Sequence, residues 1–168
     1  MNEMSGIVGE VCLTCIAEDG TVRWTETISN LVTTPGDNYY AQRAIAGVQP
    51  TNLAQPTNLV TCMKLGTGGA TAAAKTGAGA GIVSYISGSN ATFSSLSRTN
   101  NEIVYNASWT AGTATNSAIS EIAICITNNN ATSASGDCIA RAVISPARNK
   151  QASDTLTAAW THTFLGSS

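Results

Sequence analysis

The amino-acid sequence predicts an all-β fold: an antiparallel β-sandwich or jelly-roll-like domain with one short α-helix and an N-terminal β-hairpin or arm. The first observation is the alternation in residues 155–164, where one face carries Leu156, Ala158, Trp160, His162 and Phe164 and the other carries mainly threonines. The second is that roughly eight or nine short apolar segments are separated by turn-forming residues. The third is that only residues 37–47 have the spacing of a helix.

The N-terminal hairpin is the clearest local prediction. Residues 11–17 and 21–28 have the pattern of strands, and the Asp-Gly pair between them is a strong hairpin signal. The few residues before the first strand are polar and interrupted by glycine, which is typical of an extended arm. We therefore divide the chain into an arm with its hairpin, residues 1–28, which could serve as an attachment segment, and a β-sandwich domain, residues 29–168.

The remaining elements follow from periodicity and from breakers. The helix is expected to begin at its cap, Asp37, and to end at Gly47. Pro146 is expected to end a strand because it cannot donate to a ladder, and residues 147–154 are expected to form a turn. The Ala/Gly/Thr-rich stretch 70–81 is expected to be a flexible surface loop. Further strands are expected at residues 58–65, 82–86, 91–99, 102–110, 118–126 and 139–145.

Composition limits the classes of partner. The 168 residues carry a net charge of −2 without a clustered basic face, so a nucleic-acid partner is not expected. The sequence contains no apolar stretch of ~20 residues and no N-terminal signal peptide, so we expect no membrane span and synthesis in the cytoplasm. Charged residues make up 11% of the chain, against ~25% in ordinary domains. Either partners cover much of the surface, or the chain is a Thr/Ser-rich β-protein with a plain solvent face.

The cysteines predict buried, reduced thiols and no metal site. The chain has five, which is an odd number without an export signal. Cys12 and Cys15 form a C-x-x-C pair, but on a strand their side chains point to opposite faces. The chain has no second such pair and only one histidine. We therefore expect no zinc site and no metal ligand.

No residue stands out as catalytic or cofactor-binding, and the chain is expected not to be an enzyme. His162 is the only histidine, so any Ser-His or Cys-His mechanism would need it, yet its register puts it on the face of Trp160 as a core or interface residue. Glu121 lies inside an apolar strand. It is either a buried carboxylate with a raised pKa or an ion-pair partner of Arg141, and the ion pair is the favoured interpretation.

Other motifs have ordinary explanations. The glycine-rich stretches 66–69 and 77–81 do not make a phosphate loop, because Lys75 follows Ala74 instead of glycine. Four acids are expected to make local hydrogen bonds at turns or caps: Asp19, Asp37, Asp137 and Asp154. Three glycosylation sequons, at Asn90, Asn106 and Asn130, are attributed to the high content of Asn and Thr.

Four blocks carry a family resemblance. They are G-D-N-Y-Y-A-Q-R at 36–43, M-K-L-G-T-G at 63–68, A-G-T-A-T at 111–115 with I-S-E-I-A-I at 119–124, and I-A-R-A at 139–142 with Lys150, S-D-T-L-T at 153–157 and W-T at 160–161. In this order and spacing they resemble small virion structural proteins of tailed bacteriophages. The chain departs from the pattern at Cys125, where a turn or a bulkier residue would be usual. The resemblance implies capsid decoration proteins, head fibres or tail-associated proteins, and it carries over no catalytic residue.

From this resemblance we expect a capsid decoration (cement) protein on the virion surface. Its partners would be the major capsid protein and further copies of the chain, as a homotrimer. The alternative is a tail fibre, collar or baseplate component that binds a host surface, which an exposed cluster of Tyr39, Tyr40 or Tyr85 would favour. Fibre-type heptads or G-X-Y repeats are absent from the sequence. A third possibility, a small hydrolase, would depend on His162.

Overall fold

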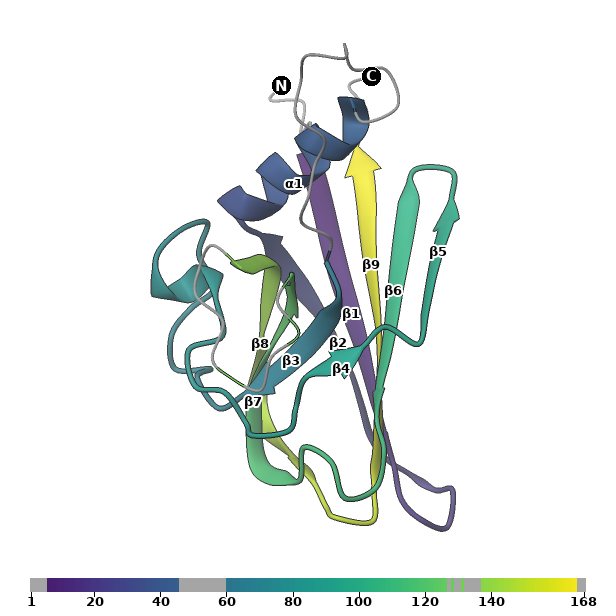
Figure 1. The fold of residues 1–168 in the computed structure, drawn as a ribbon. Helices are drawn as coiled ribbons and strands as arrows, with labels where there is room; N and C mark the ends of the chain where they lie inside the picture. Colours follow the sequence, from purple (N-terminus) through teal and green to yellow (C-terminus); the bar gives the residue numbers. More distant parts are fainter. Residues whose placement is uncertain (1–5, 46–59, 127, 129–130, 132–136, 166–168) are drawn as a thin grey trace.

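A computed structural model gives the fold (Figure 1) and describes residues 6–45, 60–126, 128, 131 and 137–165. The elements are β1 Gly6–Ile16, β2 Val22–Val32, α1 Thr34–Ile45, β3 Cys62–Gly66, the short 3-10 helix η1 Ala78–Ala80, β4 Ala91–Thr92, β5 Ser95–Thr99, β6 Glu102–Trp109, β7 Asn116–Cys125, β8 Cys138–Lys150 and β9 Thr155–Leu165. Every pair of neighbouring strands is antiparallel. The predicted all-β class with one α-helix is therefore confirmed within the described residues.

The strands form one curled sheet in the order β4-β3-β7-β8-β2-β1-β9-β6-β5. β2 pairs with β1 over most of its length but joins β8 only through Leu31 opposite Arg141 and Val32 opposite Ala140. The sheet bends at this narrow seam, so that β3, β7 and β8 lie across from β1, β9 and β6 (Figure 1). We call β4, β3, β7 and β8 the covered half and β2, β1, β9, β6 and β5 the open half.

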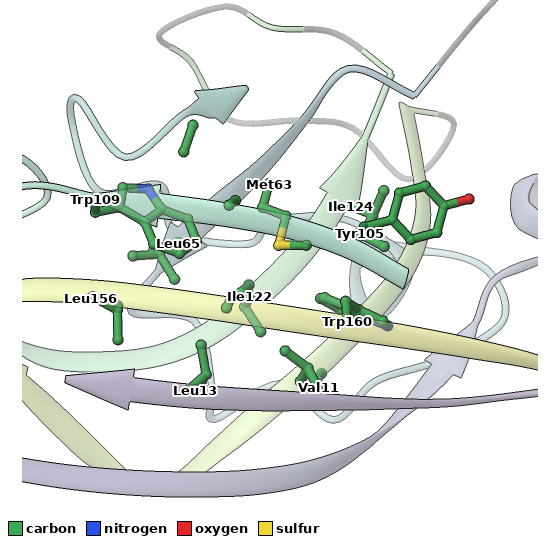
Figure 2. Packing of buried hydrophobic residues seen from close by; sticks show 14 of the residues in the cluster. Val11, Leu13, Met63, Leu65, Tyr105, Trp109, Ile122, Ile124, Leu156 and Trp160 are labelled. Atoms are coloured by element: carbon green, nitrogen blue, oxygen red, sulfur yellow. The ribbon is translucent and has the colours of Figure 1, made fainter. Parts of the chain in front are cut away.

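The main core lies between the two halves (Figure 2). The open half contributes Val11, Leu13, Tyr105, Trp109, Leu156 and Trp160, and the covered half contributes Met63, Leu65, Ile122 and Ile124. Their exposed fractions are 2% or less. The alternation in β6 and β9 produces this inner face, because every second residue of each strand points to the same side. Burying such large side chains contributes most of the favourable free energy of a fold of this kind.

The N-terminal hairpin is an integral part of this sheet. β1 and β2 form the predicted hairpin, with Gly20 in the left-handed region at its turn. The strand begins earlier than predicted: residues 6–10, expected to belong to an extended arm, are part of β1 because they pair with the end of β9. β1 also pairs with β9 over its whole length, from Gly6 opposite Leu165 to Ile16 opposite Thr155. The hairpin within the 1–28 segment is therefore continuous with the sheet of the 29–168 segment, and residues 1–5 lie outside the described part.

The helix begins earlier than predicted. Thr33, not Asp37, caps it: the Thr33 hydroxyl accepts the N–H of Gly36 at 3.1 Å and donates to the carbonyl of Cys138 at 2.6 Å. Pro35 fits in the first turn, where its missing N–H costs no helical hydrogen bond. Asp37 instead lies in that turn and pairs with Lys75 at 2.7 Å. The predicted end at Gly47 lies outside the described residues.

Three further strand predictions differ from the structure. β8 continues through Pro146 to Lys150. The register between β7 and β8 shifts between Val143 and Arg148, so Pro146 lies in a bulge. Because the bulge needs no N–H at this position for the ladder, the proline does not end the strand. The strand expected at 91–99 is divided into β4 and β5, which pair with β3 and β6 respectively. The strand expected at 82–86 forms only one isolated bridge, from Tyr85 to Gly66.

Residues 67–90, which we call the covering segment, pack with their first part on the outward side of the covered half, while Ile86 near their end joins the main core. The loop expected at 70–81 is irregular and largely exposed up to Ala78, but it ends in the short helix η1, where Gly79 and Ala80 are buried, and Ile82 after it is buried too. Ile82 joins a second apolar cluster with four residues of the sheet: Cys62, Ala123, Cys125 and Cys138. A Cβ on Gly79 would lie 2.4 Å from the carbonyl oxygen of Ala72. The small residues of this stretch therefore permit close packing.

Candidate functional site

The Glu121–Arg141 ion pair lies between β7 and β8, as the sequence predicted. Arg141 Nη2 and Nε lie 2.8 and 3.0 Å from Glu121 Oε2, and both side chains are 0% exposed. Arg141 also donates to the carbonyls of Gly68 at 3.1 Å and Thr71 at 2.9 Å. The Glu121 carboxylate accepts three N–H groups of the covering segment: Gly68 at 2.9 Å, Val83 at 3.1 Å and Ser84 at 2.8 Å. These contacts hold the covering segment on the sheet and leave the ion pair enclosed.

The glycines of the M-K-L-G-T-G block make this contact possible. A Cβ would lie 2.3 Å from Glu121 Oε1 at Gly66 and 2.5 Å from the same atom at Gly68. Glycine is therefore required wherever the backbone approaches the carboxylate this closely. Three of the four resemblance blocks meet here, because they supply the glycines, Glu121 and Arg141. These blocks mark a structural cluster.

His162 lies in a second buried polar cluster, on the inner side of the open half. Its Nδ1 is hydrogen-bonded to the hydroxyl of Tyr40, which lies 2.9 Å from the hydroxyl of Tyr105. Its Nε2 lies 3.3 Å from Asn30 Nδ2. His162 is 0% exposed, and burial lowers its pKa to about 4, so the ring is neutral near pH 7. The structure thus confirms the prediction of a core histidine, held by its two ring nitrogens.

Burial also affects the two tyrosines of this cluster. It raises the pKa of Tyr105 to about 12 and raises the pKa of Tyr40 further. Both hydroxyls therefore stay protonated and serve as hydrogen-bond donors and acceptors. The cluster is a neutral network inside the core, with ring contacts from Tyr40 to Phe164 and from Trp160 to His162.

A third polar cluster lies at the β8–β9 turn. Asp154 is 0% exposed and accepts Arg23 Nε at 2.7 Å and the N–H of Gln151 at 2.9 Å. Burial by itself raises the pKa of Asp154, but these hydrogen bonds outweigh it and the pKa is lowered. Burial and the neighbouring Asp154 raise the pKa of Cys15 to about 11, so this thiol stays protonated. Burial lowers the pKa of Lys150, whose Nζ donates to the carbonyl of Thr110 at 3.1 Å.

The outward face of the open half differs from these enclosed clusters. Its side chains form four successive rows that run across β2, β1, β9 and β6. The first row is Thr25, Thr14, Thr157 and Ser108, the second is Thr27, Cys12, Ala159 and Asn106, and the third is Ser29, Glu10, Thr161 and Val104. The last row is Val8, Thr163 and Glu102. We call these side chains the outer face. They are half-buried or exposed. Glu10 and Glu102 are the only charged members of these rows, so the face is neutral and rich in hydroxyls apart from one acidic end.

A shallow hollow of about 470 Å³ lies at the acidic end of the outer face. Its lining residues are Val8, Gly9, Glu10, Ser29, Glu102, Thr161 and Thr163. The lining offers hydroxyl groups and two carboxylates, which can accept hydrogen bonds from amides, ammonium or guanidinium groups. A partner bound here would therefore present a neutral polar surface with cationic groups opposite Glu10 and Glu102.

A second hollow, of about 650 Å³, lies between α1 and the β5–β6 turn. It is lined by Arg43 and Arg98 together with apolar Ile103 and Phe164. Two guanidinium groups beside an apolar wall could bind a carboxylate or phosphate group. The Arg43 guanidinium lies 5.0 Å from the centre of the Tyr39 ring, which places it against the helix surface.

The remaining residues singled out in the sequence are not brought together. Asp19 caps the β1–β2 turn by accepting the N–H and hydroxyl of Thr21, as predicted. All five cysteines are free thiols, with Cys12 on the outer face and Cys15 in the core. No group of three or more His, Cys, Asp or Glu among the described residues is arranged to hold a metal ion.

Tyr39, Tyr40 and Tyr85 form no joint exposed cluster. Tyr40 is 7% exposed, and Tyr39 packs edge-on against it on α1. Tyr85 lies in the covering segment, where its hydroxyl donates to Asn90 at 2.8 Å. The feature that would have favoured a glycan-binding role is thus missing from these three positions.

Sequence reasoning did not find the partners of His162 or the long-range ion pair of Asp154. Tyr40 and His162 are 122 residues apart, and Arg23 and Asp154 are 131 apart. No local pattern links such positions. The one available signal was the aspartate at a turn, and it correctly indicated only the local bond to Gln151.

Comparisons with known proteins add no assignment. In the described part of the chain no helix has the length and apolar character to span a membrane. No family model, no curated protein and no solved structure matches this chain. A function for the protein therefore has to be inferred from its own residues and surfaces.

Proposed function

We propose that this protein is a non-enzymatic virion structural protein of a tailed bacteriophage, and that it decorates the capsid as a cement protein. The resemblance of the four sequence blocks supports the virion role. The outer face is the observation that carries the decoration role, because it offers a broad, low-charge surface on a rigid sheet. The proposed partners are the major capsid protein and further copies of this chain in a homotrimer.

The outer face has the chemistry of an interface. Interface centres are depleted in charged residues, and each charge buried without a partner costs free energy. Here the charged side chains of the described rows are confined to one end, Glu10 and Glu102. The hydroxyls of the remaining rows can pair with backbone or amide groups of a shell subunit. We therefore expect binding that depends only weakly on salt.

Repetition would strengthen such a contact. A capsid offers the same site many times, and linked copies bind with an avidity above that of one site. The outer face is built on long strands, β1 and β9, whose register is fixed by their inner core residues. A preorganised surface loses little conformational freedom on binding.

The direct test is reconstitution on capsids. Heads of the parent phage are stripped of accessory proteins, incubated with purified protein and imaged, and the bound copies are counted. We expect saturation at hundreds of copies at symmetry-related positions, with the outer face toward the shell. Binding of a few copies at one vertex would assign the protein to the neck or tail, and no binding would contradict the decoration role.

Matched lysine variants locate the contact. Thr157→Lys puts an ammonium group on the outer face, in the row farthest from Glu10 and Glu102, whereas Thr76→Lys makes the same change at an exposed position of the covering segment. We expect Thr157→Lys to weaken capsid binding by at least about 10-fold, because the charge would be buried without a partner. Thr76→Lys should bind like the unmodified protein. Equal binding by both variants would place the contact elsewhere on the molecule.

A further inference from the structure

Cys125 and Cys138 face each other across the β7–β8 ladder. They are direct register partners, and their Sγ atoms lie 3.0 Å apart. Opposed residues of antiparallel strands have Cα atoms about 4.5–5.5 Å apart, inside the window of about 4.4–6.8 Å that disulfides need. The register shifts between Ile124 and Cys125, but the 3.0 Å separation of the sulfur atoms shows that the two side chains point toward each other at this position.

We propose that Cys125 and Cys138 form an intramolecular disulfide when the protein meets a small-molecule disulfide such as oxidised glutathione. One cysteine, as its thiolate, attacks the oxidant and forms a mixed disulfide, releasing one glutathione thiol. The other cysteine then attacks this mixed disulfide and releases the second. The two protein thiols lose two electrons and two protons, and the oxidant gains them as two thiols.

The geometry favours this pair over the other cysteines. Cys62 is also a register partner of Cys125, on β3, but its Sγ lies 3.9 Å from the Cys125 carbonyl oxygen. The Cys15 thiol lies 3.7 Å from Asp154 Oδ2, in the polar cluster at the β8–β9 turn. Cys12 lies on the opposite face of β1 from Cys15. Cys125 and Cys138, by contrast, have their two sulfur atoms in contact at 3.0 Å.

The site explains where the bond would act. Cys125 and Cys138 end β7 and begin β8, beside the Ile126 N–H bond to the Asp137 carbonyl at 2.8 Å. Both thiols are 0% exposed in the cluster that Ile82 covers. A bond here would close the connection between the strands and lie beneath the covering segment, shielded from reductants. Because reagents reach it only through opening, oxidation is best carried out during refolding.

The experiment refolds the full-length chain from urea into a glutathione redox buffer and maps the thiols. We expect the titratable thiols in denaturant to fall from five to three. Trypsin leaves both cysteines in one peptide, residues 99–141, and cleavage before Asp137 then yields two fragments held by the disulfide. A bond to Cys62 would instead join the 99–141 peptide to residues 44–64. We also expect the oxidised protein to melt roughly 5–10 °C higher than the reduced protein.

The controls separate bond formation from a general effect of oxidant. Cys125→Ser and Cys138→Ser should each abolish both the thiol loss and the rise in Tm, while Cys12→Ser should still lose two thiols. The mapping of the unmodified chain does not depend on these variants being stable. Five titratable thiols after refolding, or a bond between any other pair, would overturn the proposal.

Discussion

The outward sides of the two halves of the sheet differ: that of the covered half is buried, and that of the open half is exposed or half-buried. In the covered half, outward residues such as Glu121, Ala123 and Arg141 are 0% exposed beneath the covering segment. In the open half, the corresponding positions of β1, β2, β6 and β9 carry mostly small hydroxyl side chains, half-buried or exposed. The covered half therefore has a cover of its own, whereas the outer face of the open half has none in the chain described.

This difference gives the low charge of the chain a structural meaning. Five charged side chains among the described residues are 0% exposed: Lys64, Glu121, Arg141, Lys150 and Asp154. The charges available to the surface are thus fewer than the 11% composition indicates. Charge is used inside the molecule to fix loops and turns, and it is nearly absent from the broad face where a partner would bind.

The largest expected effect comes from removing the ion pair that holds the covering segment on the sheet. Glu121→Ala leaves the Arg141 guanidinium buried without its partner, so we expect a loss of about 3–5 kcal/mol in the free energy of unfolding. Urea denaturation measures this loss. The double variant Glu121→Leu, Arg141→Met should be less destabilised than Glu121→Leu alone, because no unpaired charge remains. A single variant within about 1 kcal/mol of the unmodified protein would show that the ion pair does not hold the covering segment.

The next effect belongs to the inner side of the open half. The pKa of His162 is about 4 in the folded protein and 6.5 when unperturbed, so between these values the unfolded chain binds the extra proton. The free energy of unfolding should fall by roughly 3 kcal/mol as the pH drops from 6.5 to 4. His162 is the only histidine, so His162→Gln should remove this part of the pH dependence. An unchanged slope in that variant would contradict the neutral, buried assignment.

Two glycines in strands, one in each half of the sheet, differ in the space that their surroundings leave for a Cβ atom. A Cβ at Gly66 in β3 would lie 2.3 Å from Glu121 Oε1 and 2.4 Å from the carbonyl oxygen of Ser84, whereas at Gly6 in β1 it would meet nothing within 4 Å. We expect Gly66→Ala to cost about 1–3 kcal/mol and Gly6→Ala to change stability by less than ~0.5 kcal/mol. Thermal unfolding of both variants checks this. Equal melting temperatures would mean that the covering segment adapts freely.

The smallest effect concerns the outer face itself. Thr157→Lys should change the free energy of unfolding by no more than about 1 kcal/mol, because Thr157 is half-buried on the outer face and a long lysine side chain can reach solvent from there. Ala123→Lys, an outward position of the covered half, should destabilise strongly because it places an ammonium group beneath the covering segment. Chemical denaturation of the two variants measures this difference between a position on the outer face and a position beneath the covering segment. A large loss for Thr157→Lys would indicate that the outer face is part of the folding core.

Local periodicity was enough to predict most of the strands. β6 and β9 alternate strictly, and the structure buries the predicted faces. β8 was cut short at Pro146, since a proline normally ends pairing and the bulge that accommodates it depends on the register with β7. The helix start was misplaced because Thr33 and Asp37 are both good caps, and the contact that selects Thr33 is the distant carbonyl of Cys138.

The polar clusters could be predicted only in part. Glu121 was recognised because a carboxylate inside an apolar strand needs a partner, and Arg141 on the next strand supplied one. The covering segment was missed because its Ala/Gly composition is equally typical of flexible loops. The covering segment is held by hydrogen bonds that it makes with Glu121 and Arg141, which lie far along the chain from it. Such a contact cannot be predicted from the composition of the segment alone.

The pairing of the first strand with the last has a kinetic consequence. β1 pairs with β2, which follows it directly, and with β9, which begins only at Thr155, so the β1–β9 ladder forms only after β9 has been synthesised. Until then one edge of β1 has no partner, and the core side chains Val11 and Leu13 have nothing to pack against from β9. Pairings between such distant segments slow folding to the range of roughly milliseconds to seconds. The N-terminal hairpin therefore has to wait, with one edge open, for the strand that completes its side of the core.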